Sequence, residues 1–286
     1  MGFSSRCAFA SALLLTLSFA PRLSSAHENG VCTCANCPVV RTFKQSQWYV
    51  VETQNFSVHS DESKLHAENV AKHSESLLKE LRSKWLGSPD RKRWEPKCEI
   101  YLHGKRSSYL AAVGRGAGQT VGSSLVKNEG LKITARRLDL VGGRSDYLAA
   151  ALPHELTHIV LKDKFVDTAL PRWADEGTAI LADTKEKQER HRADLSRGMT
   201  TGKSFSASEL LILEDYPKPE QFGVFYGQSA SLTEYLVSQK GPSTFLTFIE
   251  KANSVGYDSA LKTLYNIQSV GELDRRWRRQ LMLASR

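Results

Sequence analysis

The sequence predicts an α+β fold in which strands come first and helices later. Segments with the alternation of strands lie in the first half of the 286-residue chain, whereas helical periodicity dominates the second half. The composition, 41% hydrophobic and 24% charged, is that of an ordinary globular protein and excludes collagen-like or wholly disordered chains. Such a chain must derive its stability from a hydrophobic core.

Residues 1–26 have the three-part pattern of a secretory signal peptide. A positive start precedes an apolar run at residues 8–20, and small residues follow at 24–26. The apolar run is shorter than the roughly 20 residues that a membrane-spanning helix needs. We therefore expect cleavage without stable membrane insertion, and a secreted or periplasmic protein.

Four cysteines remain after removal of that segment: Cys32, Cys34, Cys37 and Cys98. The first three lie in residues 27–44, a lead-in without apolar periodicity. An oxidising compartment favours disulfides, and we expect Cys98 to be bridged to one of the other three. A small thiolate metal site in the lead-in, or free thiols, are the alternatives.

The first half of the chain contains the expected strands and one long helix. Strands are predicted at 48–52 and 56–59, and a helix runs from a cap at Ser60 or Asp61 to about Trp85. Its apolar stripe comprises Leu65, Val70, Leu77, Leu78, Leu81 and Trp85. Its two histidines, His66 and His73, have polar neighbours and are expected to be solvated.

Further strands are expected at 98–103, 131–135 and 138–141, with a glycine-containing loop at 114–122 between the first two. A helix follows over 145–161, and Pro153 inside it predicts a local kink. A second helix is expected from Pro171 to about Asp183. Residues 184–225 are mixed, and the chain is then mostly helical, with breaks at 241–242, 256 and 271.

The chain contains the pentapeptide His154-Glu155-Leu156-Thr157-His158. Residues i and i+4 of a helix share one face, so both imidazoles can reach one zinc ion. Glu155 lies about 100° around the helix, where it can act on water as a general base without binding the metal. The motif therefore predicts a catalytic zinc site.

Eighteen residues after His158, Glu176 stands near the start of the next expected helix, in the segment WADEGTA. HELTH followed by this segment resembles the gluzincin metallopeptidases, and in particular their peptidase-MA-like branch. The resemblance covers about residues 45–286. It implies one Zn²⁺ ion held by His154, His158 and Glu176, with Glu155 as the catalytic base.

The resemblance also implies a zincin-like domain over 45–286, with a strand-bearing lobe at about 45–165 and a helical lobe at about 166–286. Gluzincins commonly stabilise the oxyanion with a residue of the helical lobe, and Tyr226 is the candidate here. Asp183 and Asp175 compete as residues that could orient a ligand histidine. Residues 131–135 are the candidate edge strand along which a peptide would lie.

We therefore expect an exported zinc metallopeptidase that acts on a peptide or protein substrate. A zinc hydrolase of non-peptide amides such as cell-wall material, and a non-catalytic zinc-binding module, are the alternatives.

The charge balance is basic. Lys and Arg total 39 against 31 Asp and Glu, a formal charge of +8. Arginine and tryptophan are interleaved at 91–94 and at 275–279, as they are in some nucleic-acid-binding surfaces. An exported chain meets little nucleic acid, so we expect no such partner. Binding of acidic polymers or lipid headgroups is the alternative for these clusters.

Overall fold

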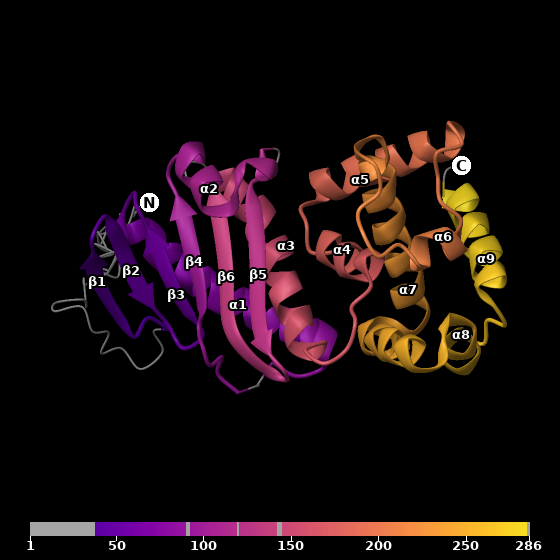
Figure 1. Ribbon diagram of the computed structural model, residues 1–286, viewed down its shortest axis with the longest axis horizontal. Coiled ribbons are helices and arrows are strands. Elements are labelled where there is room, and N and C mark those ends of the chain that lie inside the picture. The colour runs from indigo at the N-terminus through magenta and orange to yellow at the C-terminus, as the bar shows by residue number, and fades with distance from the viewer. Residues whose placement is uncertain (1–37, 90–91, 119, 142–144, 285–286) are drawn as a thin grey trace, which may run out of the picture.

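A computed structural model describes residues 38–89, 92–118, 120–141 and 145–284. A mixed sheet lies at one end of the molecule, and helices alone make up the other end (Figure 1). The α+β class is confirmed. The predicted signal peptide at residues 1–26, as well as Cys32, Cys34 and Cys37, lies outside the described residues.

The elements follow the expected order, strands first and helices later. The strands are β1 (Arg41–Gln45), β2 (Trp48–Glu52), β3 (Phe56–Ser60), β4 (Cys98–His103), β5 (Gly122–Glu129) and β6 (Lys132–Val141). The helices of the strand-rich half are α1 (Lys64–Leu86), α2 (Arg106–Val113), the 3₁₀ turn η2 (Arg115–Ala117) and α3 (Ser145–Lys164). Those of the helical half are α4 (Arg172–Ile180), α5 (Lys185–Thr200), α6 (Ala207–Leu211), η3 (Pro219–Gln221), α7 (Phe222–Val255), α8 (Tyr257–Tyr265) and α9 (Val270–Ala284).

The six strands form one sheet in the order β1-β2-β3-β4-β6-β5. Strands β3, β4 and β6 are parallel, whereas the pairs β1–β2, β2–β3 and β5–β6 are antiparallel. Helices α1 and α3 pack on one face of the sheet, and α3 contacts β5 and β6. Strand β5 is therefore the edge strand nearest to the helix that carries the HELTH motif.

Apolar side chains alternate along the strands, so that they line the face of the sheet on which α1 and α3 pack. Val58, Ile100 and Leu138 occupy paired positions on β3, β4 and β6, and all three are fully buried. On α1, the residues at 70, 77, 78, 81 and 85 form the buried stripe that meets them, as predicted. Leu65 was also assigned to this stripe, but it is 66% exposed. It lies about 140° around the helix from Val70, which places it off the stripe.

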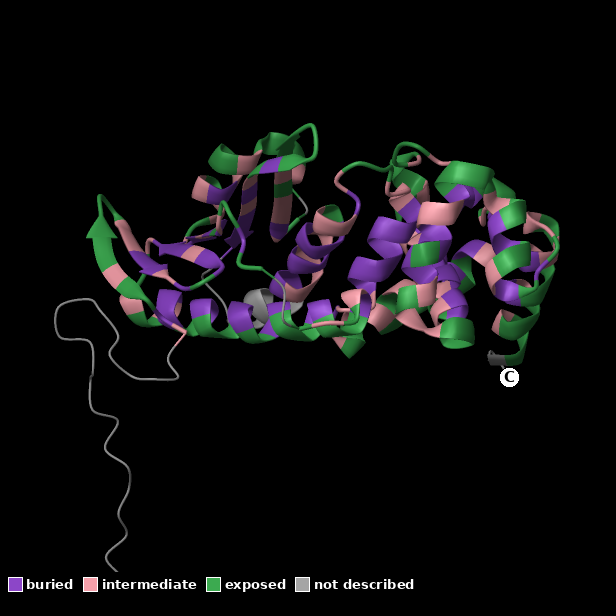
Figure 2. Ribbon diagram, turned by 90° about the horizontal axis from the view of Figure 1, so that it is seen from below, coloured by how far each residue is buried: buried purple, intermediate pink, exposed green. Residues whose placement is uncertain are grey.

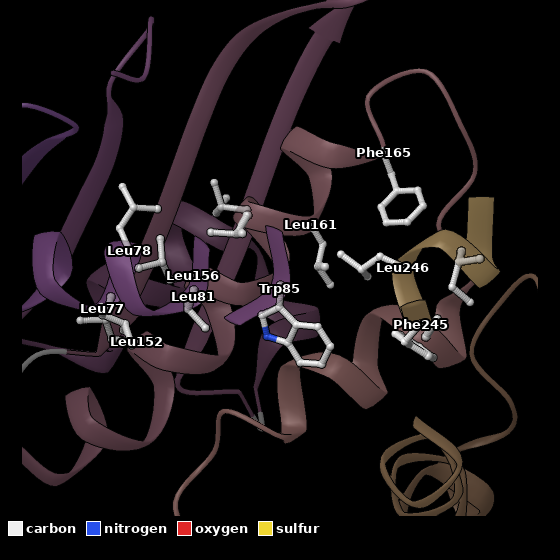
Figure 3. Packing of buried hydrophobic residues seen from close by; sticks show 14 of the residues in the cluster. Leu77, Leu78, Leu81, Trp85, Leu152, Leu156, Leu161, Phe165, Phe245 and Leu246 are labelled. Atoms are coloured by element: carbon white, nitrogen blue, oxygen red, sulfur yellow. The ribbon is translucent and has the colours of Figure 1, made fainter. Parts of the chain in front are cut away.

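One buried cluster continues from the sheet into the helical half. Figure 3 shows leucines of α1 and α3 around Trp85, with Phe245 and Leu246 of α7 close by. The ring centroids of Trp85 and Phe245 are 6.3 Å apart, and those of Trp173 on α4 and Phe245 are 5.9 Å apart. Purple segments accordingly run through the centre of both halves in Figure 2, while the outer turns are green. The aromatic rings of Trp85, Trp173 and Phe245 thus pack α1, α4 and α7 against one another.

Helices α4 and α7 approach most closely at Gly177. A Cβ atom there would lie 2.3 Å from the carbonyl oxygen of Ser229 and 2.3 Å from Oγ1 of Thr233. Gly177→Ala is therefore expected to lower the free energy of unfolding by about 1–3 kcal/mol, because two packed helices must separate. Chemical denaturation measures the change. Gly116→Ala is the matched control, since nothing lies within 4 Å of a Cβ at that position, and a similar loss there would contradict the explanation.

Three strands differ from the prediction. The lead-in 27–44 was expected to lack regular structure, yet Arg41–Gln45 forms β1, an edge strand that is exposed at four of its five residues. A strand without a buried face has no alternation to detect.

Strand β5, at residues 122–129, was not predicted either, and four of its eight residues are exposed. The predicted strands 131–135 and 138–141 are one strand, β6, which lies between β4 and β5. The candidate edge strand at 131–135 was therefore wrong.

Helix boundaries also differ in places. Helix α1 is capped by Ser63, whose side chain accepts a hydrogen bond from the His66 amide, and not by Ser60 or Asp61. The expected break at 241–242 is present, because Gly241 has the non-helical angles φ 83° and ψ 168°. The chain also leaves the helical conformation at Gly256 as expected. The third break lies at residues 266–269, between α8 and α9, so its predicted position at Gly271 was wrong.

Cys98 has a free thiol within the described part of the chain. Its three expected partners lie outside the described residues, so the disulfide stays a prediction. The residue begins β4, pairs with Phe56 of β3, and is 0% exposed. Burial raises the pKa of its thiol, so it remains protonated and behaves as a small apolar core residue.

Among the helices of the described residues, none combines the length and the apolar character that crossing a membrane would require.

Candidate metal centre

Helix α3 presents His154 and His158 one turn apart. Their ring centroids are 4.9 Å apart with planes at 77°. Pro153 lies inside the helix without interrupting it, and its carbonyl accepts a hydrogen bond of 2.8 Å from the Thr157 hydroxyl. The i, i+4 spacing thus gives two imidazoles on a common face, as the motif indicated.

Helix α4 brings the third predicted ligand to the same place. After α3 the chain turns back through residues 165–171, and Glu176 lies in the second turn of α4. Its Oε2 is 3.7 Å from Nε2 of His154 and 3.9 Å from Nε2 of His158. The carboxylate is buried, and the three ligand atoms lie within 4.8 Å of one another. These residues form a group that could hold a metal ion.

Each histidine has an aspartate carboxylate beside its Nδ1 atom, on the side of the ring away from Glu176. Asp175 Oδ1 lies 2.6 Å from Nδ1 of His158, and Asp183 Oδ1 lies 3.2 Å from Nδ1 of His154. A proton on each Nδ1 leaves the lone pair of Nε2 directed toward Glu176. The two aspartates were treated as competitors for one role, but each orients one histidine. Lys187 Nζ fixes Asp183 in turn, at 2.9 Å.

The separations of these atoms can be compared with those around a bound zinc ion. Bonds of about 2.0–2.2 Å at tetrahedral angles place neighbouring ligand atoms roughly 3.3–3.5 Å apart. The carboxylate oxygen lies 3.7 and 3.9 Å from the two Nε2 atoms, and all three ligand atoms lie within 4.8 Å of one another, so side-chain movements must bring them closer around an ion. Two imidazoles and one carboxylate are residue types that bind metal ions, and a carboxylate beside each ring would orient it.

The titration of these groups follows from their surroundings. Burial alone would lower the pKa of His158, but the charge of Asp175, assisted by Glu176 and Glu155, raises it to about 10. Burial alone would raise the pKa of Glu176, but its interaction with His154 and the charges of both imidazoles lower it to about 2. The pKa of His154 is also raised against its burial, chiefly by Asp183. Without a metal, the carboxylates therefore favour protonated imidazoles. A metal ion bound at Nε2 would replace that proton and its positive charge.

Glu155 lies between α3 and the edge strand. A Cβ atom at Gly122, the first residue of β5, would lie 2.8 Å from Cγ and 2.9 Å from Oε1 of Glu155. Because Gly122 has no side chain, the side chain of Glu155 can occupy this space. Glu155 also contributes to the electrostatic environment of His158 and Tyr226. The predicted base therefore lies beside the histidines and does not belong to the three-residue metal group.

Tyr226, the candidate for the oxyanion, is half-buried near the start of α7. Its ring packs against those of Phe225 at 5.5 Å and His191 at 5.7 Å. Burial and the nearby charge of Glu176 raise the pKa of its hydroxyl to about 12, so it is protonated at neutral pH.

A second tyrosine at the site was not anticipated. Tyr216, in the loop between α6 and α7, donates a hydrogen bond to Oε1 of Glu176. The guanidinium of Arg172 lies 4.5 Å from the centre of the Tyr216 ring. Tyr216 belongs to a stretch without periodicity, so the sequence carries no signal for it. Arg172 could have been noticed from its position one turn before Glu176.

The aspartates provide a test of the site that does not require a substrate. Asp175→Asn is expected to weaken zinc binding by about 10–100-fold, because an amide cannot fix the Nδ1 proton of His158 as a carboxylate does. Asp183→Asn is expected to act in the same direction but less, since its contact is longer. Competition with a chromophoric chelator measures both constants. Asp167→Asn, at an exposed position, is the control, and equal affinity for the Asp175 variant would contradict the role of that residue.

Comparison with known proteins adds no assignment: no protein-family model matches the chain, and no curated protein matches it.

Proposed function

We propose that this chain is a zinc metallopeptidase of the gluzincin type. One observation carries the proposal: two Nε2 atoms and one carboxylate oxygen converge within 4.8 Å, and each Nδ1 faces its own aspartate. A buried group of this composition has little structural purpose without a metal, since it concentrates three carboxylates around two imidazoles. The HELTH motif and its resemblance to gluzincins support the same reading.

Zinc held by His154, His158 and Glu176 would supply Lewis acidity at the point where they converge. Glu155, which is not one of these ligands, would accept the proton of the attacking water and pass it to the leaving amine. Its position against Gly122 restricts the carboxylate to the side of the site that faces β5.

The oxygen that gains negative charge needs a hydrogen-bond donor. Tyr226 has a hydroxyl with a pKa of about 12, so it can donate without losing its proton. The hydroxyl of Tyr216 is already engaged by Glu176. We therefore assign oxyanion stabilisation to Tyr226, and orientation of the ligand Glu176 to Tyr216.

Strand β5 offers a place for an extended peptide. It pairs with β6 on one side only, so the other edge of the described sheet is open there. A peptide added to this edge would form main-chain hydrogen bonds and pass Glu155 at Gly122. The zincin-like arrangement of a strand-bearing lobe and a helical lobe around this cleft belongs to the same proposal, as does export by the signal peptide at residues 1–26.

The decisive experiment combines metal analysis with a digest. Purified protein, free of its signal peptide, is expected to contain about one zinc ion per chain and to cleave members of a diverse peptide library analysed by mass spectrometry. Cleavage should stop with a chelator and return with added zinc. The Glu155→Gln variant, treated identically, excludes a contaminating protease.

Protein without affinity for zinc would overturn the proposal. Zinc-loaded protein that cleaves no peptide, but releases amine from cell-wall fragments, would assign the site to a non-peptide amide hydrolase. Zinc binding without either activity would leave a binding module.

A further inference from the structure

A cavity of about 540 Å³ lies in the helical half. It is enclosed by α5, α7 and α9, which lie together in the right-hand part of Figure 1. None of His154, His158 or Glu176 lines it. Its volume is within the range of about 300–1,000 Å³ that is typical of small-molecule sites.

The walls of the cavity are mainly apolar. They include Leu195 and Met199 of α5, Tyr235 of α7, and Trp277 and Leu281 of α9. Trp277 donates its indole N–H to Oγ of Ser231 at 3.0 Å, so its ring meets the cavity with its polar atom already satisfied. These apolar walls favour a hydrocarbon.

The positive charge lies beside the cavity and not in its wall. Arg192 lines the cavity but is paired with Glu234, another lining residue, at 3.8 Å. An adjoining hollow of about 470 Å³ shares Tyr235 and Gln280 with the cavity. This hollow is lined by the arginines of the 275–279 cluster that face outward, Arg275, Arg276 and Arg279. Arg276 is paired with Glu272 at 2.6 Å, but Arg279 has no ion pair among the described residues.

Exposed apolar side chains continue from the cavity into this hollow. Met282 lines the cavity and is 61% exposed, whereas Leu283 lines the hollow and is 64% exposed. An apolar interior, an apolar rim and arginines beside it match a ligand with a hydrocarbon chain and one anionic end.

We propose that this cavity binds a single-chain anionic amphiphile, such as a long-chain fatty acid. The hydrocarbon chain occupies the space between α5, α7 and α9, and the carboxylate lies against Arg279 and Arg275. The basic, tryptophan-containing segment at 275–279 then has a defined role as the recognition element for the head. This inference is independent of the proposed peptidase activity.

Binding can be measured with cis-parinaric acid, an 18-carbon fluorescent fatty acid, below its micelle concentration. We expect saturable 1:1 binding and competition by unlabelled fatty acids, with affinity rising roughly fourfold per buried methylene group until the cavity is full. Hexadecyltrimethylammonium, which has a similar chain and a cationic head, is expected to compete at least tenfold more weakly than palmitate.

Three variants separate the two parts of the site. Ala230→Phe fills the cavity from α7, and Ser196→Trp obstructs it from an exposed position of α5 that is not part of the core. Both are expected to abolish binding. Arg279→Glu is expected to weaken fatty-acid binding at least tenfold. Arg190→Glu makes the same charge change on α5 outside both hollows and is expected to have no effect. Circular dichroism verifies that each variant is folded.

Several results would overturn the proposal. These are no saturable binding of the probe, equal affinity for the anionic and cationic amphiphiles, or unchanged binding by the folded Ser196→Trp variant. Binding only to vesicles of phosphatidylglycerol, and not to monomeric fatty acid, would also refute it, since a membrane surface would then be the partner of the arginines.

Discussion

Replacing Glu155 with glutamine is expected to reduce peptide hydrolysis by about 10²–10⁴-fold and to leave zinc affinity close to that of the parent. Glutamine keeps the size of the side chain but cannot accept the proton of water, and a positioned general base contributes about this factor. The residue is outside the group that could hold the metal, so the ligands are undisturbed. Turnover of a peptide identified in the digest, together with zinc content, gives both numbers.

The matched control is Glu189→Gln, the same change at an exposed position of α5. It should retain full turnover. If the Glu155 variant were as active as this control, the base would have to be another group. If it lost its zinc instead, Glu155 would be a ligand and the assignment of roles would be reversed.

Glu176→Gln is expected to have the opposite pattern, with loss of the metal as the primary effect. An amide oxygen is a poorer zinc ligand than a carboxylate. The change also removes the negative charge that lies 3.7 and 3.9 Å from the two Nε2 atoms. Zinc affinity should fall by more than the 10–100-fold expected when a residue behind a ligand is changed.

Calorimetric titration with zinc measures this affinity, and turnover at saturating zinc distinguishes loss of metal from loss of chemistry. Glu176 is buried, so circular dichroism must first show that the variant folds. Unchanged affinity in a folded variant would remove Glu176 from the ligand set and end the gluzincin interpretation.

The part of the fold that the sequence predicted is the part with one buried face. The stripe of α1 and the strands β3 and β4 have periodic apolar residues because they meet the same core. Strands β1 and β5 are edges with exposed residues on both faces, so nothing in their pattern distinguishes them from loops. The burial of Cys98 could not be predicted for a related reason. The positions of the cysteines are visible in the sequence, but the burial of Cys98 depends on the pairing of β3 with β4.

At the site, local spacing was sufficient only within a helix. The pair His154 and His158 follows from i, i+4 geometry alone, whereas Glu176 was identified through a resemblance. Asp175 and Asp183 could be named as candidates, but their division between the two histidines depends on how α4 crosses α3. Tyr216 comes from a loop 40 residues beyond Glu176, and no local pattern encodes such a contact.

The origin of the three carboxylates has a further consequence. Asp175, Glu176 and Asp183 all belong to one short stretch, residues 175–183, whereas both imidazoles belong to α3. A helix rises 1.5 Å per residue. A shift of α4, and of the residues that follow it, by one residue along α3 would therefore move all three carboxylates away from the imidazoles together. Gly177 allows α4 to pack closely against α7 as well. The centre is thus formed or lost as a unit, and metal affinity reports the register between two helices from opposite halves of the molecule.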